Sequence, residues 1–280
     1  MNNSRQILAP LRGVTTRSFR LAFAQQLTEA GFDEAVTPFI PASSSYDVLR
    51  DRELEGGESI FLTPQFIGKD PYALKESLKR ILDAGYKTAD LNVGCPYPMV
   101  RNKCRGAGLL ANPSLLESMI EGGCSIMGEG CFSIKTRLGI NSPDELFKFI
   151  DVFNRYPLRF ITVHSRTAKQ MYEGSCDIER LNEIIKLSKI PIVANGDIQM
   201  THSFKTPVMI GRAFVRHLGE RNDANILLMH YKETLLKERF SSNAVLGKLK
   251  ELLSYWRHIP RWNRLWPVLK LSRALDEFTV

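Results

Sequence analysis

The chain has 280 residues, 44% of them apolar and 24% charged, which excludes a disordered or collagen-like chain and predicts an ordinary globular protein. This length allows one barrel of about 200 to 250 residues with a small addition, or two ordinary domains. Lys and Arg exceed Asp and Glu by 38 to 30, and the net charge of +8 is compatible with an RNA partner but also with a merely basic surface.

The start of the chain and the cysteines indicate where the protein works. The apolar stretch at residues 7–9 is too short for a signal peptide. No run approaches the roughly 18 apolar residues that a membrane span needs. The five cysteines form no CxxC pair, and their odd number leaves at least one unpaired. We therefore expect a cytoplasmic protein with no membrane segment.

Short apolar segments alternate with longer amphipathic ones over most of the chain. The predicted strands span residues 6–9, 34–37, 60–67, 89–93, 131–136, 160–164, 190–194 and 208–210. Helical patterns lie between many of them, at residues 72–84, 113–127, 142–156 and 178–187. This alternation predicts a parallel sheet covered by helices, and eight strands favour a closed (β/α)8 TIM barrel, an α/β fold.

Three helices carry a recognisable starting signal. Asp70, Asn112 and Ser142 each precede a proline, so a capping side chain is followed by a residue whose missing N–H costs nothing in the first turn of a helix.

Strand signals stop near Asp223, and residues 224–237 and 243–257 are predicted as helices. We therefore divide the chain into a catalytic barrel, residues 1–218, and a small C-terminal helical domain, residues 219–280. The second part carries basic side chains interleaved with rings, namely Lys248, Lys250, Arg257, Arg261, Arg264, Lys270 and Arg273 with Tyr255, Trp256, Trp262 and Trp266. This mixture suits phosphates and stacked bases, although the rings would also serve to pack the helices together.

A single thiol marks the end of a predicted buried strand. Cys95 lies in the sequence Asn-Val-Gly-Cys-Pro, and the loop behind it reaches Gly106 and Gly108, which permit close approach of the backbone. A cysteine there can be a nucleophile, a metal ligand, a proton donor or only a small buried residue. Because Cys104 is the next cysteine and no histidine is near, we expect no metal site.

Charged residues follow or interrupt the next strands. Lys135 stands in an apolar strand, where it needs a negative partner such as a reduced flavin unless it reaches water. Arg137 shares its face of the strand. His164, with Arg166 two positions on, is as compatible with a structural role as with a site.

Two glycine turns end the last strands. Asn195-Gly196-Asp197 and Gly211-Arg212 occupy the loops where barrels commonly bind phosphate, through backbone N–H groups and a helix N-terminus. Each turn alone is a weak signal, but their order strengthens both.

From about Leu8 to Phe214 the chain resembles the flavin-dependent tRNA-dihydrouridine synthase family, on five fragments: Leu8-Ala9-Pro10, Asp90 to Pro96, Ile134 to Arg137, Val163 to Thr167 and Ala194 to Asp197. The resemblance implies that Cys95 is the catalytic acid and that Asn92 contacts the target uracil, and we place Arg137, Arg166 and Tyr172 with Asn92 as substrate-binding residues. It assigns flavin contacts to Pro10, Leu11, Arg12, Gln65, Lys135, His164, Asn195, Gly196, Asp197, Gly211 and Arg212.

The reaction that the resemblance implies is reduction of specific uridines in tRNA to 5,6-dihydrouridine. NADPH or NADH reduces FMN, hydride passes to carbon 6 of the uracil, and Cys95 protonates carbon 5. The reference pKa of a thiol, near 8.5, keeps it mostly protonated at neutral pH. The expected partner is tRNA, although another structured RNA would fit, and we expect a monomer without metal.

The chain departs from the family in three places. Residues 198–207 are too few for the usual helix, which predicts a less well covered barrel, an edge or apolar patch near Phe204 and Pro207, and weaker flavin retention. Arg12 replaces a commonly acidic or small polar residue, and Ile178 replaces a frequent tryptophan.

Two other functions stay open. One is a flavin oxidoreductase acting on a small pyrimidine or enone, which the basic C-terminal segment disfavours. The other is an RNA-binding barrel that has lost its cofactor, which the presence of Cys95, Lys135 and His164 disfavours.

Overall fold

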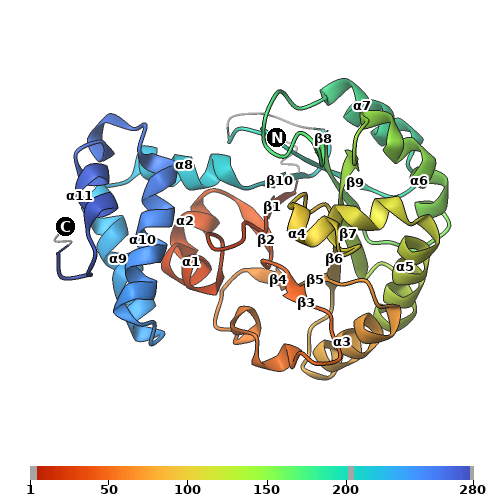
Figure 1. Cartoon of the computed structure of the whole chain (residues 1–280), viewed down its shortest axis with the longest axis horizontal. Coiled ribbons are helices and arrows are strands. Elements are labelled where there is room, and N and C mark those ends of the chain that lie inside the picture. Colours follow the sequence, from red (N-terminus) through yellow and green to blue (C-terminus); the bar gives the residue numbers. More distant parts are fainter. Residues whose placement is uncertain (1–4, 201–204, 278–280) are drawn as a thin grey trace.

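The computed structural model describes residues 5–200 and 205–277, except for the side chains of Ala224 and Arg261. Its centre is a parallel sheet (Figure 1). The strands are β1 (Gln6–Leu8), β2 (Phe32–Val36), β3 (Ile40–Pro41), β4 (Phe61–Thr63), β5 (Gln65–Ile67), β6 (Ala89–Val93), β7 (Phe132–Gly139), β8 (Ile161–Thr167), β9 (Ile192–Asn195) and β10 (Val208–Ile210).

The sheet closes into the predicted (β/α)8 barrel. β1 pairs with both β10 and β2, and the ladder runs from β5 through β6, β7, β8 and β9 to β10. The remaining gap is closed because β4 and β5 are one strand, interrupted only at Pro64, and pair with β2 and β3 in turn. Proline cannot donate to a ladder, and the Pro64 carbonyl instead accepts from the Asp90 N–H at 2.9 Å.

All eight predicted strands are present. The barrel helices are α1 (Arg17–Ala22), α2 (Ala24–Glu29), α3 (Pro71–Asp83), α4 (Pro98–Arg101), α5 (Pro113–Met127), α6 (Phe147–Phe153), α7 (Ile178–Leu187) and α8 (Arg212–Arg221). The predicted helix at 142–156 forms as a 3-10 turn followed by α6. Asp70, Asn112 and Ser142 cap their helices as predicted, each accepting from a backbone N–H.

No helix covers the described residues between β9 and β10, which are 196–200 and 205–207. The expected loss of one outer helix is therefore confirmed for these positions, and Pro207 is half-buried, whereas Phe204 lies outside the described residues. β10 still pairs on both sides, with β9 and β1.

A buried carboxylate is paired with two arginines near the amino ends of the strands. Glu34 on β2 is fully buried, and its carboxylate accepts from Arg159 at 2.7 and 3.1 Å and from Arg5 at 2.5 Å. The Thr63 hydroxyl donates to the same carboxylate. A buried carboxylate is tolerable because both of its oxygens are paired with guanidinium groups.

The C-terminal helices are α9 (Ala224–Lys237), α10 (Ser242–Trp256) and α11 (Leu265–Leu271), at the left of Figure 1. α10 packs against α8, α9 and α11, and α9 packs against α1. Trp256 and Trp262 are fully buried with ring centroids 4.4 Å apart. Their indole N–H groups donate to the carbonyls of Val215 at 2.5 Å and Gly219 at 2.8 Å on α8. These two rings therefore pack helices, the alternative that the sequence left open.

Position 218 lies inside α8, and the division of the chain there stays a prediction. In the part of the chain that the structure describes, no helix is both long and apolar enough to cross a membrane.

Two adjacent glycines of α5 test the packing of helix on sheet. A Cβ at Gly123 would lie 2.1 Å from Cε1 of the buried Phe132, whereas one at Gly122 would meet the flexible end of Lys75 at 3.0 Å. Gly123→Ala should lower the free energy of unfolding by about 1 to 3 kcal/mol through overpacking. Gly122→Ala should change it by less than about 1 kcal/mol, since alanine favours helix. Urea unfolding measures both, and equal effects would contradict this account of the packing.

Candidate active site

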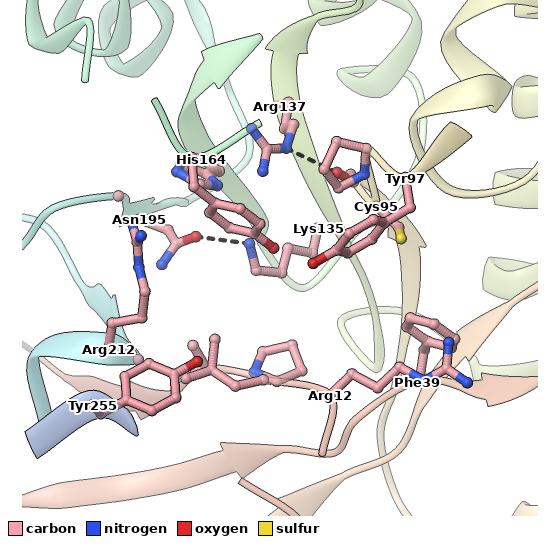
Figure 2. A pocket seen from close by; sticks show the side chains of 18 of the residues that line it. Arg12, Phe39, Cys95, Tyr97, Lys135, Arg137, His164, Asn195, Arg212 and Tyr255 are labelled. Atoms are coloured by element: carbon pink, nitrogen blue, oxygen red, sulfur yellow. Dashed lines mark hydrogen bonds between the residues drawn. The ribbon is translucent and has the colours of Figure 1, made fainter. Parts of the chain in front are cut away.

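A cavity of about 520 Å³ lies at the carboxyl ends of the strands, where α10 faces the barrel. Figure 2 shows side chains converging on it from the segments after β1, β2 and β6, from β7, β8 and β9, and from α8 and α10. The volume is typical of a small-molecule site. Its wall includes Pro10, Leu11, Arg12, Phe39, Asn92, Cys95, Tyr97, Lys135, Arg137, His164, Tyr172, Asn195, Gly196, Gly211, Arg212 and Tyr255.

The turn after β6 holds Cys95 at the cavity wall. The Asn92 side-chain oxygen accepts from the N–H groups of Gly94 at 3.1 Å and Cys95 at 2.9 Å. Gly106, at φ +56°, packs so closely that a Cβ there would lie 2.8 Å from the Cys95 Cβ. Cys95 is 8% exposed, and burial raises the pKa of its thiol, so this group stays protonated at neutral pH.

The β7 lysine is half-buried at the cavity wall, without a carboxylate in direct contact. Lys135 Nζ donates to Asn195 Oδ1 at 2.7 Å, and Asn195 in turn donates to the Met209 carbonyl at 2.7 Å. Burial lowers the pKa of Lys135 to about 7, and the charge of Arg137 adds to this effect. Burial, followed by the charges of Arg137 and Lys135, also holds the pKa of His164 well below its usual value. This wall therefore favours an acceptor-rich or anionic ligand, whose charge would offset these costs.

Hydrogen bonds and contacts with an aromatic ring hold arginines at or near the cavity. Arg137 donates to the carbonyls of Gly94, Thr167 and Met171 at 2.9, 2.9 and 2.7 Å. Its guanidinium lies 5.3 Å from the ring of Tyr172, and that of Arg212 lies 5.0 Å from the same ring. Such contacts orient a guanidinium while leaving donors for a ligand.

Asp197 ties two of these arginines together. It accepts from Arg166 Nη1 at 3.1 Å and from Arg212 Nη2 at 3.0 Å, and both charges lower the pKa of Asp197 after the hydrogen bond from Arg166. Arg166 is 2% exposed and does not line the cavity. It positions Asp197, which positions Arg212.

Most residues expected in the site line this cavity; Gln65 and Arg166 are buried outside its lining, and Asp197 is exposed outside it. Sequence reasoning missed Phe39, Tyr97, Arg216, Glu251, Ser254 and His258. Tyr97 directly follows the Cys95-Pro96 pair and could have been found from that neighbourhood. The α10 residues gave no local signal, because only the packing of α10 over the barrel brings them to the cavity.

Comparison with known proteins gives consistent matches. A family model described as dihydrouridine synthase (Dus) matches residues 7–217. The tRNA-dihydrouridine(16) synthase of Vibrio parahaemolyticus serotype O3:K6 (strain RIMD 2210633) is 30% identical over 207 residues, covering 69% of this chain and 63% of that protein. The chain thus matches less than two thirds of this relative's length. The enzyme of the same name from Vibrio cholerae serotype O1 (strain ATCC 39315 / El Tor Inaba N16961) is 28% identical over 97% of this chain and 93% of its own.

Solved structures share the fold. The old yellow enzyme homologue from Zymomonas mobilis superposes with a TM-score of 0.56 at 13% identity, covering 76% of this chain and 85% of that one. At this identity the likeness supports the barrel architecture alone.

The lowered pKa of Lys135 makes stability depend on pH. Between about pH 7 and its ordinary value of 10.5, the unfolded chain binds more protons at this residue than the folded one, so stability rises with pH in this window. The difference in unfolding free energy between wild type and Lys135→Met should therefore shift in favour of wild type by about 2 kcal/mol from pH 7 to 9. Urea unfolding of ligand-free protein measures it, and a pH-independent difference would show that Lys135 is not buried as a neutral amine.

Proposed function

Because the chain belongs to the dihydrouridine synthase family, we propose that it reduces specific uridines in tRNA to 5,6-dihydrouridine, using FMN held in this cavity and NADPH or NADH as reductant. The observation that carries the proposal is the Cys95 thiol, kept protonated at the edge of a cavity whose other walls supply hydrogen-bond donors.

The residues of the cavity fit a flavin. Pro10 and Leu11 offer an apolar surface for a ring, while Lys135 and Arg212 offer donors and positive charge and His164 offers a neutral imidazole. A Cβ at Gly211 would lie 3.0 Å from the Ala9 Cβ, so glycine lets the start of α8 come close to the end of β1. A phosphate is stabilised at such a helix N-terminus. The contacts that we propose for FMN are Pro10, Leu11, Arg12, Lys135, His164, Asn195, Gly196, Gly211 and Arg212.

In the proposed reaction, the hydride for carbon 6 of the uracil comes from the reduced flavin. Cys95 gives its proton to carbon 5, and the thiolate regains a proton from solvent. A thiol of raised pKa is present almost wholly as the acid, so the donor is in its active form. Asn92 and Arg137, on either side of this turn, would orient the base.

A tRNA substrate suits the surroundings of the cavity. A uridine must leave the base stack to reach it. Arg12 is exposed and its guanidinium lies 5.1 Å from the centre of the Phe39 ring, while Arg216, Arg257 and His258 line the side formed by α8 and the C-terminal helices. Positive side chains and the rings of Tyr97 and Tyr255 suit the phosphates and bases of an extruded nucleotide.

The cofactor is tested first, by the absorbance spectrum of the purified protein and identification of the compound released on denaturation. Identification of FMN as the released compound would support the proposal. Protein that is colourless and cannot be reconstituted with FMN would favour an RNA-binding barrel instead. Incubation with NADPH and tRNA from a strain lacking dihydrouridine, followed by mass spectrometry of nucleosides, tests the product. Reduction of free pyrimidines or enones without any action on tRNA would favour a small-molecule oxidoreductase.

Cys95→Ala separates binding from chemistry. The variant should keep FMN and tRNA affinity within about twofold, because the thiol makes a minor part of the wall. Dihydrouridine formation should fall by about 100-fold or more, as expected for loss of a general acid. Turnover at the wild-type rate would refute the assignment of Cys95 as the acid.

A further inference from the structure

A chain of buried amide and carboxyl groups runs from the barrel interior to the cysteine turn. Asn92 Nδ2 donates to Gln65 Oε1 at 2.7 Å, and Gln65 Nε2 donates to Asp90 Oδ1 at 3.3 Å. Asp90 and Gln65 are fully buried, and Asn92 is 8% exposed. We call these three side chains the amide relay.

The direction of the relay is fixed by the backbone. The N–H groups of Gly94 and Cys95 both point at one atom of the Asn92 amide, and only its oxygen can accept from them. The Asn92 NH2 group must then face Gln65, which has to present its oxygen. The Gln65 NH2 group consequently faces Asp90, and a carboxyl group ends the relay because it can accept.

The far side of Asp90 is also satisfied. Ser133 Oγ donates to Asp90 Oδ2 at 3.3 Å, so each carboxyl oxygen has a donor. Burial raises the pKa of Asp90 to about 7, and the hydrogen bond from Gln65 opposes this rise. A reversed Gln65 amide would put two acceptors together at Asp90 and two donors together at Asn92.

On the premise of the proposed function, we propose that Gln65 and Asp90 are positioning residues, which act through Asn92 to hold the Cys95 turn and to aim one N–H of Asn92 into the cavity. Asn92 uses its oxygen for the backbone and one N–H for Gln65, so only a donor is left for a ligand. That donor can bind a carbonyl oxygen, such as either one of uracil, and it cannot accept from an amino group.

This role differs from direct contact with the cofactor. Gln65 does not line the cavity, whereas Asn92 and Cys95 do. Loss of the relay should therefore loosen the turn around Cys95 without removing a group that touches the flavin.

Alkylation of Cys95 by iodoacetamide, followed by peptide mass spectrometry on FMN-loaded protein, tests the proposal. Gln65→Met keeps the length of the side chain but removes both hydrogen bonds. It should raise the Cys95 alkylation rate by about tenfold, the size of effect that one buried hydrogen bond can bring. Ser77→Ala is the matched control, since it removes a buried hydrogen bond to the Ala73 carbonyl on α3, outside the relay, and it should leave the rate within about twofold.

Cys124 provides a control within the same molecule, because it is on α5 and is also 8% exposed. A rise at Cys95 alone supports the relay. A parallel rise at Cys124, or in Ser77→Ala, would mean that the core has loosened generally and would overturn the proposal. An unchanged Cys95 rate with a large loss of FMN affinity in Gln65→Met, measured by fluorescence titration, would also overturn it and assign Gln65 to the flavin.

A measurement on wild-type protein covers the case in which Gln65→Met does not fold. Side-chain N–H groups of Asn92 and Gln65 should exchange with solvent at least about 100-fold more slowly than that of the exposed Asn141, as buried hydrogen-bonded groups do. Exchange as fast as that of Asn141 would overturn the relay. None of these readouts needs tRNA turnover, so a protein that fails to make dihydrouridine would refute the proposed function while the relay is still tested.

Discussion

The structure of the site depends on holding basic side chains, most of them buried, at one end of the barrel. Lys135, Arg137, His164 and Arg166 gather there, and burial lowers the pKa of both Lys135 and His164. Asp197 pairs with Arg166, but neutral acceptors hold two of the others: Asn195 for the lysine and backbone carbonyls for Arg137. Such acceptors satisfy hydrogen bonds without cancelling charge, so the cavity keeps a positive potential for an anionic or acceptor-rich ligand.

At the opposite end of the barrel, a buried charge is held by direct ion pairs. Glu34 is buried there too, but Arg5 and Arg159 neutralise it directly. Both oxygens of this carboxylate are used by these ion pairs, which suits a structural role. The asymmetry between the two ends follows the general rule that barrels place chemistry at the carboxyl ends of their strands and stability at the amino ends.

Local patterns predicted much of this molecule. The strands followed from the hydrophobic periodicity and composition of the sequence. Cys95, Lys135 and His164 were singled out because each lies within or just after an apolar run. The cavity residues that the sequence did not predict are placed by contacts between residues far apart in the chain. Glu251 and His258 reach the cavity only because α10 packs against α8 through Trp256, which no local pattern reveals. Hydrogen bonds to residues 25 and 27 positions away join Gln65 to Asp90 and Asn92, which no local pattern reveals, and its contact with a flavin stays a prediction.

The short link between β9 and β10 leaves the site less affected than the sequence suggests. No described residue of 198–207 lines the cavity, whose nearby walls come from Asn195, Gly196, Gly211 and Arg212. Asp197 joins Arg166 and Arg212 across the two ends of the link, and the buried tryptophans hold α8 from its other side. The position of the α8 N-terminus is therefore set by side-chain contacts on both sides of it. A covering helix between β9 and β10 would add buried area to the barrel, but it is not what shapes the proposed phosphate site.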